Sequence, residues 1–369
     1  MSASDPENLG RRAAGRARDP IRRVRRTVRR FVLGALAPFA SDGSAPLPDL
    51  RACRRILLVS VNERLGNSIL PTAPVAALRA ALPEARLDFV GGPLAPAILR
   101  GLGVATVRTL KRSDAWRPWR LLALVRALRA ERYDAAIHLA GSTGSLGALL
   151  VGASGATHRI GVRRADGNVF FTSALEPPDD VHKVDELRAL VRQLGVDAPA
   201  GRCLALAPEE RAAAAERLAR ELGPDGAAPV AIFVGGRARK GKAWPLEAFA
   251  KVAEGLRAQH LPILVFLGPE ELAREGEIRA ALGPAHYVAE PDLRRVAALV
   301  AACRAVLAPD SGPMHLAIAA GTPTVAIFMR ENFDRWGPQA AHGRVIYDPQ
   351  GHRAGEALDA LLKSAARRP

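Results

Sequence analysis

One pattern recurs along this chain of 369 residues and limits its fold more than any other feature. An apolar run of strand length is followed by a glycine, and then by a segment with apolar residues at helical spacing. Strands that alternate with helices in this way predict a parallel sheet covered by helices on both faces. The pattern occurs in two separate blocks, so we predict an α/β fold with two Rossmann-like domains whose parallel sheets face each other across a cleft. Strands are expected at residues 55–61, 86–90, 133–139, 229–234, 263–267, 305–308 and 324–328, and helices at residues 74–82, 121–130, 182–194, 245–259 and 293–302.

Composition suggests where the domains begin and end. Hydrophobic residues make up 49% of the chain, which is enough for each domain to bury its own core. We expect an N-terminal extension over residues 1–50, an N-terminal domain over residues 51–200 and a C-terminal domain over residues 201–369. The break is expected at residues 199–208, or slightly later at residues 223–229, where Pro and Gly occur. Ligands of open parallel sheets bind outside the carboxyl ends of the strands, so the chemistry is expected in the loops that follow them.

The extension carries a large share of the formal net charge of +16. Residues 1–30 hold ten arginines against three acidic residues, and residues 21–37 have apolar side chains at helical spacing between the arginines. This pattern is typical of a basic amphipathic helix. An anionic membrane surface is one expected partner, where each arginine contributes about 1 kcal/mol. A solvated tail is the alternative, and a nucleic-acid partner is not expected because no aromatic residues interleave with the charges.

Two further absences bound the function. No run of eighteen apolar residues and no secretory signal occurs, so a cytoplasmic location is expected. Cys53, Cys203 and Cys303 lie far apart and form no C-x-x-C pair, so neither a zinc site nor a disulfide framework is expected.

The most informative segment follows the strand at residues 305–308. Asp310 and Ser311 are good helix caps, and Pro313 is placed for the first turn of a short helix that ends at Gly321. A helix N-terminus with free N–H groups attracts anions such as a diphosphate, and His315 adds a donor one turn later. The alternative is a well-capped helix with no ligand.

The sequence Asp-Ser-Gly-Pro-Met-His at residues 310–315, followed by Gly-Thr-Pro-Thr-Val-Ala-Ile-Phe, resembles the donor-site signature of the family 9 glycosyltransferases, the heptosyltransferases of lipopolysaccharide synthesis. Three other segments agree in order and spacing, so the resemblance covers about residues 54–350. They are residues 56–78, residues 133–141 with 159–161, and residues 234–237 with 242–245. The resemblance implies a GT-B fold that holds a nucleotide-diphosphate sugar on its C-terminal domain.

The resemblance also implies individual donor-binding residues. Lys242 matches the lysine that neutralises the donor diphosphate, although a solvated loop lysine is the ordinary alternative. Gly268 and Glu270 lie where the family approaches the nucleotide ribose, although Glu270 is equally plausible as an exposed glutamate at a helix start. Met314 is expected to pack rather than to contact the donor. The full donor-binding set is Gly235, Gly236, Arg237, Lys242, Gly268, Glu270, Asp310, Ser311, Gly312, Pro313, Met314 and His315, and the nearby Arg239 and Lys240 add positive charge.

The first loop departs from the family. Gly66-Asn67 stands where the family has Gly-Asp, and that aspartate is proposed as the base for the acceptor hydroxyl. Asparagine cannot accept a proton at neutral pH, although it can orient a hydroxyl. Three outcomes are open: Glu63 acts as the base, another carboxylate acts while Asn67 positions the acceptor, or the protein binds without catalysing. Arg64, Gly66 and His138 are the expected acceptor contacts, and His182 either lines the cleft or is structural.

These residues predict a metal-independent, inverting transfer of a sugar to a hydroxyl of a lipopolysaccharide-core or other cell-surface glycan, with heptose as the sugar that the family suggests. No Asp-x-Asp pattern occurs, so no metal and no other cofactor is expected. The acceptor would be lipid-linked, with the enzyme held peripherally at the inner membrane. The alternatives are a catalytically silent GT-B protein that binds nucleotide sugar or glycan, and a sugar-nucleotide epimerase on the same fold.

Overall fold

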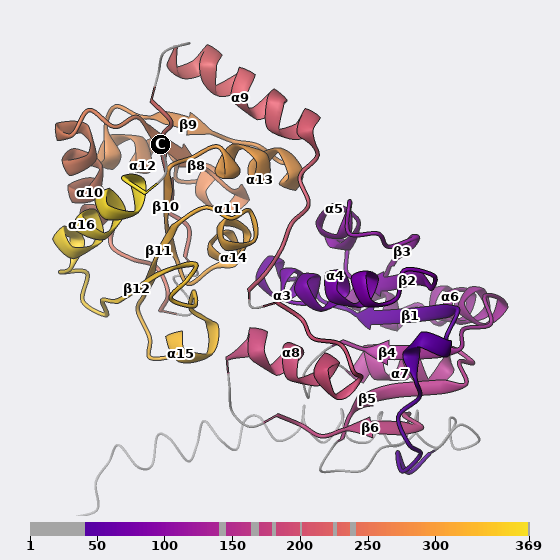
Figure 1. Ribbon diagram of the computed structural model, residues 1–369. Coiled ribbons are helices and arrows are strands. Elements are labelled where there is room, and N and C mark those ends of the chain that lie inside the picture. The colour runs from indigo at the N-terminus through magenta and orange to yellow at the C-terminus, as the bar shows by residue number, and fades with distance from the viewer. Residues whose placement is uncertain are drawn as a thin grey trace, which may run out of the picture.

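The computed structural model describes residues 41–139, 145–163, 170–178, 182–199, 201–223, 227–236 and 241–367. The helix expected at residues 21–37 lies outside the described residues, as do Arg237, Arg239 and Lys240. Figure 1 shows two lobes, each built on a twisted sheet with helices on both faces.

The N-terminal lobe contains six parallel strands in the order β3-β2-β1-β4-β5-β6. Its register places Ile56 of β1 between Leu87 of β2 and Ala135 of β4. The strands are β1 (Arg55–Ser60), β2 (Arg86–Gly91), β3 (Thr106–Thr109), β4 (Ala135–His138), β5 (His158–Val162) and β6 (Ser173–Leu175). The helices are η2 (Leu50–Ala52), α3 (Leu65–Ile69), α4 (Thr72–Ala81), α5 (Ala95–Leu99), η3 (Arg112–Trp116), α6 (Pro118–Ala130), α7 (Ser145–Ala153) and α8 (Lys183–Gln193).

The C-terminal lobe repeats this connectivity. Its six parallel strands have the order β12-β11-β10-β7-β8-β9, so in both sheets the first strand and the fourth are central neighbours. The strands are β7 (Val230–Phe233), β8 (Ile263–Phe266), β9 (His286–Val288), β10 (Ala305–Pro309), β11 (Thr324–Phe328) and β12 (Gly343–Tyr347). The helices are α9 (Pro208–Leu222), α10 (Leu246–Ala258), α11 (Pro269–Leu272), α12 (Glu275–Leu282), α13 (Leu293–Ala301), α14 (Gly312–Ala319), α15 (Phe333–Trp336) and α16 (Ala354–Ala365). The prediction of an α/β fold with two parallel sheets is confirmed.

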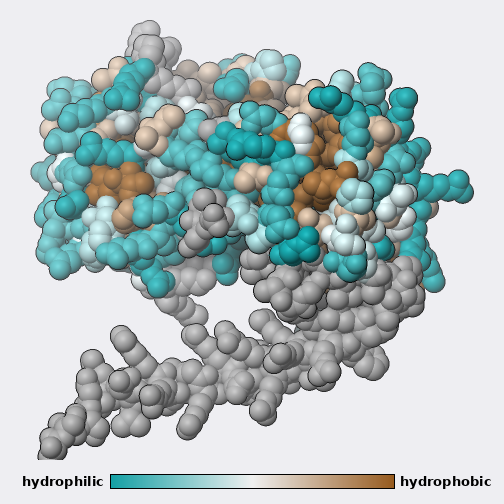
Figure 2. Space-filling view, turned by 60° about the horizontal axis from the view of Figure 1, so that its bottom comes forward, coloured by the Kyte–Doolittle hydropathy of each residue, from teal (hydrophilic) through white to brown (hydrophobic). Residues whose placement is uncertain are grey.

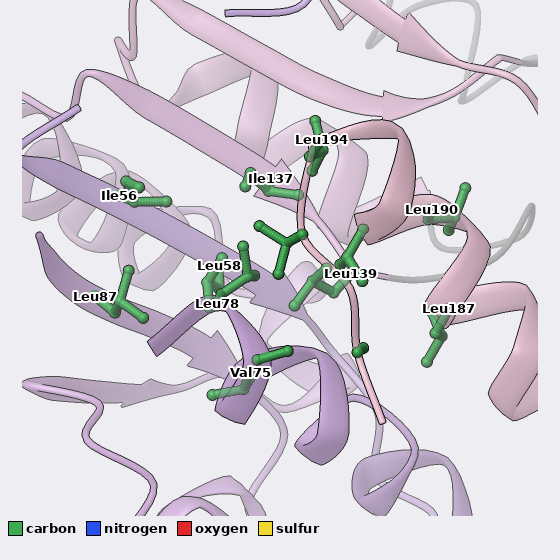
Figure 3. Close-up of a cluster of buried hydrophobic side chains, with 14 of the residues drawn as sticks. Ile56, Leu58, Val75, Leu78, Leu87, Ile137, Leu139, Leu187, Leu190 and Leu194 are labelled. Atoms are coloured by element: carbon green, nitrogen blue, oxygen red, sulfur yellow. The ribbon is translucent and has the colours of Figure 1, made fainter. Parts of the chain in front are cut away.

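Alternation along the central strands explains the layers. Successive side chains of a strand point to opposite faces. Ile56 and Leu58 therefore pack on one face of the sheet with α4 and α8, as Figure 3 shows, whereas Leu57 and Val59 pack on the other face with α6 and α7. Both faces are buried, so residues 56–59 form a continuous apolar run and give the strong sequence signal described above.

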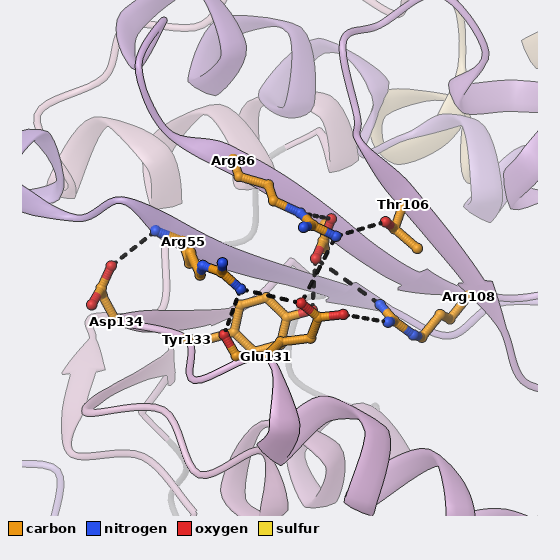
Figure 4. A network of polar contacts seen from close by, with 8 residues as sticks. Arg55, Arg86, Thr106, Arg108, Glu131, Tyr133 and Asp134 are labelled. Carbon is orange, nitrogen blue, oxygen red and sulfur yellow. Dashed lines mark hydrogen bonds and ion pairs between the residues drawn. The ribbon is translucent and has the colours of Figure 1, made fainter.

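A polar network lies at the amino-terminal edge of the N-terminal sheet. Buried Asp88 accepts a hydrogen bond from the hydroxyl of Tyr133 at 2.8 Å and pairs with Arg86 at 3.2 Å. Glu131 pairs with Arg108 at 2.7 Å and with Arg55 at 3.3 Å (Figure 4). This network ties β1, β2 and β3 together. It lies at the edge opposite the strand carboxyl ends, so it is not a candidate for catalysis.

The surface is mainly hydrophilic on the face shown in Figure 2, where hydrophobic residues reach the surface only in separate groups. No helix in the described part of the chain is long and apolar enough to cross a membrane.

The two lobes share buried contacts. Ile69 of α3 and Ile98 of α5 are fully buried in a hydrophobic cluster with residues of α13 and α14. Leu204 and Leu206, in the segment that joins α8 to α9, belong to the same cluster. The N-terminal lobe therefore meets the C-terminal lobe through the helices that follow β1 and β2.

Candidate active site

The candidate site lies where the carboxyl ends of the two sheets approach each other. In each sheet the strand order reverses between the first and fourth strands, and ligands of such sheets bind at this switch point. Helix α3 follows β1 and helix α14 follows β10, so each begins at the switch point of its own sheet. These two helices pack against each other (Figure 1), which brings the predicted acceptor loop beside the predicted donor loop.

Two glycines allow this close approach. A Cβ placed on Gly66 would collide with Cδ2 of His315 and would lie 3.0 Å from Nε2 of the same ring. A Cβ placed on Gly312 would lie 2.8 Å from Cβ of Leu65. Gly66 and Gly312, predicted as acceptor and donor contacts respectively, thus set the distance between the lobes.

The position of the Lys242 side chain is fixed by an ion pair. Lys242 forms an ion pair with Asp310, which is only 8% exposed, and Asn332 donates a second hydrogen bond to the same carboxylate at 3.1 Å. Trp244 fixes the loop that carries Lys242, because its indole N–H donates a hydrogen bond to buried Asp348 at 2.8 Å. The Lys242 side chain therefore lies beside the start of α14, and the hydrogen bond of Trp244 holds the loop that carries this lysine.

The N-terminus of α14 has polar groups that no described side chain satisfies. Ser311 occupies the N-cap position and Pro313 lies in the first turn, as predicted, but the Ser311 side chain makes no capping hydrogen bond. Its hydroxyl oxygen is buried and has no partner within the described part of the chain. Asp310 does not cap the helix either, since its carboxylate binds Lys242. The alternative of a well-capped helix without a ligand therefore does not describe this segment, because the first-turn N–H groups have no side-chain cap from Ser311.

Glu271, the neighbour of the predicted Glu270, is the acid that lies beside the loops after β7 and β8. Glu270 is exposed, whereas the Glu271 carboxylate reaches back over the loops that follow β7 and β8. Its oxygens lie 2.5 Å from a Cβ placed on Gly235 and 2.6 Å from one placed on Gly268. Burial raises the pKa of Glu271, with a smaller upward effect from the charge of Glu270. Glu270 is thus the exposed glutamate at a helix start that the sequence offered as an alternative, and Glu271 is the acid that lies against these two glycines.

Gly236 has a backbone role in the same loop. A Cβ at this position would lie 2.5 Å from the carbonyl oxygen of Lys242, so only glycine lets the two parts of the loop close on each other. Met314 is fully buried in the core, as predicted for a packing residue.

His315 lies at the centre of the contact between the lobes. Its ring is 5% exposed, faces Gly66, and meets Trp336 edge-on at 6.4 Å between centroids. Nδ1 is buried with no hydrogen-bond partner among the described residues. Burial, with added repulsion from Arg202, His182 and Lys242, lowers the pKa of His315 well below its ordinary value. The ring is therefore neutral at pH 7.

His182 and Arg202 add polar groups from the N-terminal lobe and the linker. His182 caps α8 by accepting the N–H of Val184 on Nδ1 at 3.2 Å, so Nε2 carries the proton and donates to the carbonyl of Gly337 at 2.8 Å. Burial lowers the pKa of His182. Arg202 is 7% exposed, its Nε and Nη2 have no partner in the described chain, and burial lowers its pKa to about 10. His182 thus has a structural role between the lobes, and Arg202 is a buried positive charge near His315.

The acceptor side is more open. Glu63 and Arg64 are exposed, and Asn67 is partly exposed. Glu63 is held in place because it accepts the backbone N–H of Arg112 at 2.8 Å. A carboxylate therefore stands in the first loop, close to α3, while the side chain at position 67 carries no charge.

The structure corrects one acceptor residue. His138 ends β4 as predicted, but its ring is 5% exposed, stacks on Phe171 at 6.0 Å and is covered by Gly147 of α7. These neighbours belong to the N-terminal lobe, so the ring packs between the sheet and α7 instead of facing an acceptor.

The arrangement can bind an anion and remove a proton nearby. No cluster of three or more His, Cys, Asp or Glu suited to a metal ion occurs among the described residues. Lys242 and the α14 N-terminus can attract an anion such as a diphosphate, and Glu63 supplies an exposed carboxylate in the loop before α3. Sequence reasoning missed Glu271, Asn332 and Arg202. Of these three, only Glu271 could have been found from the sequence, because it is the second acid of the Gly-Pro-Glu-Glu segment at residues 268–271.

Comparisons with known proteins agree with this geometry. The family model described as glycosyltransferase family 9 (heptosyltransferase) matches residues 121–356. Lipopolysaccharide heptosyltransferase 2 of Escherichia coli K12 is 30% identical over 132 residues, which are 33% of this chain and 38% of that protein. The matched stretch thus spans well under half of that relative.

Two solved structures share the fold across almost their whole length. The glycosyltransferase family 9 protein of Veillonella parvula superposes with a TM-score of 0.73 at 22% identity, covering 85% of this chain and 98% of that one. The E. coli ADP-heptose lipopolysaccharide heptosyltransferase II has a TM-score of 0.70 at 21% identity, covering 85% and 99%. The two-lobed arrangement is therefore the GT-B fold of these proteins.

Proposed function

The chain belongs to glycosyltransferase family 9, and from this premise we propose that it transfers a sugar from a nucleoside-diphosphate donor to a hydroxyl of a lipopolysaccharide-core glycan. The observation that carries the proposal is the unsatisfied N-terminus of α14 beside Lys242, at the switch point of the C-terminal sheet. A diphosphate has the charge and the acceptor oxygens that this arrangement lacks.

Transition-state stabilisation follows from the same groups. As the bond between the anomeric carbon and the diphosphate oxygen breaks, negative charge builds on the leaving diphosphate. Lys242 and the first-turn N–H groups of α14 lie where that charge develops, and they are fixed before the reaction. These groups neutralise the diphosphate without a divalent cation, so we propose a metal-independent transfer.

An ADP-linked heptose is the donor that we propose. The solved E. coli relative is named for ADP-heptose, and the present chain has the groups to hold such a nucleotide. Glu271 lies against the two glycine loops after β7 and β8, where its carboxylate can accept ribose hydroxyls. Its raised pKa reflects burial that a hydrogen-bonded ribose would offset.

The acceptor enters from the N-terminal lobe. Glu63 takes the proton of the acceptor hydroxyl, whose oxygen attacks the anomeric carbon from the face opposite the diphosphate, so the configuration is inverted. Asn67 orients the hydroxyl, and Arg64 offers charge to an anionic glycan. A lipid-linked acceptor places the enzyme peripherally at the inner face of a membrane.

The test is thermal unfolding of the purified chain with ADP-, GDP-, UDP- and dTDP-linked sugars. A donor present at about 100 times its Kd adds about 2.7 kcal/mol of stability, a rise of several degrees in Tm. We expect ADP-heptose to give this rise, Lys242→Ala to abolish it, and Lys251→Ala, at an exposed lysine of α10, to retain it. No rise with any donor would contradict the proposal. An isomer formed from the donor alone, without acceptor, would instead identify an epimerase.

A further inference from the structure

The described surface has one segment where large apolar side chains stand out of the protein. Trp116 is 84% exposed, Trp119 is 66% exposed and Leu122 is 48% exposed. All three lie within seven residues, on η3 and the first turns of α6. Tryptophan is usually well buried, so a pair of exposed tryptophans in one short segment requires an explanation.

The local packing of α6 explains why these side chains are exposed. Only Leu128 of this helix is buried, and Leu121, Leu124 and Val125 are partly buried against the core beneath α7. That face already supplies the contacts that hold α6 on the sheet. Trp116, Trp119 and Leu122 point elsewhere and add nothing to the core, so they are available to an external partner.

The charges around them are almost all positive. Arg117, Arg120 and Arg126 are exposed, and no acidic residue occurs in α6. The nearest acid along the chain, Asp114, is buried, accepts the N–H of Lys111 at 3.0 Å and pairs with both Arg120 at 3.1 Å and Arg117 at 3.8 Å. One carboxylate thus faces two of the three exposed arginines, and the segment keeps a net positive charge. Exposed tryptophan and leucine among arginines are typical of segments that lie in the interface of an anionic bilayer.

This segment also lies beside the acceptor loop. The backbone N–H of Arg112, the first residue of η3, donates to Glu63. A bilayer that contacts η3 and α6 would therefore lie next to the carboxylate to which the acceptor hydroxyl must come.

We propose that the α6 face, formed by Trp116, Arg117, Trp119, Arg120, Leu122 and Arg126, docks on an anionic lipid bilayer. The tryptophans and Leu122 enter the headgroup region, and the arginines pair with lipid phosphates. Docking itself does not depend on the proposed function, whereas its use, to present a lipid-linked acceptor beside Glu63, rests on that function. The surface differs from the basic helix predicted in the N-terminal extension and adds a second point of attachment close to the site.

The experiment measures binding of the full chain to vesicles of phosphatidylcholine with phosphatidylglycerol, and to vesicles of phosphatidylcholine alone. Trp116→Ser combined with Trp119→Ser should lower the partition coefficient on the anionic vesicles about tenfold. The matched control is Leu272→Ser, which removes a 45% exposed leucine from the C-terminal lobe and should leave binding unchanged. Because every variant keeps the extension, its contribution is the same throughout.

A second measurement locates the tryptophans. Vesicles with brominated acyl chains should quench the fluorescence of the parent chain. The double variant should lose most of this quenching, because Trp244 is buried and Trp336 is partly buried against the core. Equal binding and no quenching difference between parent and double variant would overturn the proposal. A fluorescence change produced by a soluble phosphorylated glycan, and not by vesicles, would also overturn it and assign the face to glycan.

The donor-induced rise in Tm is measured on the same variants to separate the two proposals. Loss of vesicle binding in the double variant with the rise intact supports docking. Absence of the rise in the parent chain contradicts the proposed function and leaves the vesicle result standing.

Discussion

The two sides of the contact between the lobes differ in how far they are organised before a substrate binds. On the C-terminal side, Lys242, Asp310 and Asn332 form a connected group, and the hydroxyl of Ser311 is buried beside it. On the N-terminal side, Glu63 and Arg64 are exposed, and only one hydrogen bond from Arg112 fixes Glu63. Under the proposed function, the ordered C-terminal side would hold the anionic part of the donor, and the more exposed N-terminal side would receive the acceptor.

This difference separates binding from chemistry. Fixed charges at a site bind the charged part of a ligand and stabilise charge that develops there. An exposed carboxylate contributes little to binding, and its effect is expected in proton transfer once an acceptor lies over it. Changes on the two sides should therefore alter different measured quantities.

The largest effect is expected from Glu63→Gln. The amide retains an oxygen for the Arg112 N–H, so the loop should keep its position, but it cannot take a proton. We expect kcat to fall by about 10²–10⁴-fold, the usual contribution of a general base, with the donor-induced rise in Tm unchanged. The control is Glu84→Gln, at an exposed glutamate outside the site. Normal turnover in Glu63→Gln would remove Glu63 as the base and leave the proton acceptor to another group.

The next largest effect is expected for Gly66→Ala, which should lower the free energy of unfolding because the two lobes are close together at Gly66. Gly66→Ala places a methyl group against the buried ring of His315, and neither the ring nor α14 has room to move without disturbing the core. Overpacking of this kind costs about 1–3 kcal/mol. Urea unfolding should show this loss, while Gly276→Ala in α12, where nothing lies within 4 Å of the new methyl group, should be neutral or slightly stabilising. Equal stabilities for the two variants would mean that the lobes separate easily.

The sequence predicted the fold well because the central strands are buried on both faces. The runs at β1, β7 and β11 are continuous apolar segments, so their ends were placed within one residue of those observed. Helix α3 and strand β6 were not expected, since five and three residues are too short to show a period. Their existence depends on contacts with segments far away in the chain.

The site was predicted in part for similar reasons. The motif at residues 310–315 follows from local rules for helix starts, and it does begin α14. Whether Ser311 caps that helix depends on the direction of its side chain, which no local rule supplies. The choice between Glu270 and Glu271 depends on the phase of the four-residue helix α11. Arg202 is buried in the linker near His182 and His315, against the general preference of arginine for the surface, and no local pattern predicts this position.

Glu271→Gln tests the C-terminal side of the site, and its expected effect is smaller than those of Glu63→Gln and Gly66→Ala. Removing the charge of a carboxylate that accepts ribose hydroxyls should weaken donor binding about tenfold, since hydrogen bonds to a charged group contribute about 1.5–3 kcal/mol and the amide keeps part of this. Glu270→Gln is a matched control, because the neighbouring carboxylate is exposed and turned away. Isothermal titration with the nucleotide diphosphate measures both affinities. If Glu270→Gln weakened binding and Glu271→Gln did not, the assignment by geometry would be reversed.

The smallest effect is the dependence of stability on pH at the contact between the lobes. Burial lowers the pKa of both His182 and His315, so each ring is neutral in the folded chain when it is already protonated in the unfolded one. The unfolded state therefore binds more protons below about pH 6.5, and the free energy of unfolding falls as the pH drops from there, by at most about 1.4 kcal/mol per pH unit for each ring. About one pH unit above 6.5 the rings are neutral in both states and give almost no slope. Urea unfolding from pH 5.5 to 7.5 should show this fall, and His315→Gln should reduce its slope, whereas replacing the exposed His352 by Gln should not. A slope unchanged in His315→Gln would mean that water or an anion reaches the ring, and that the donor side is as open as the acceptor side.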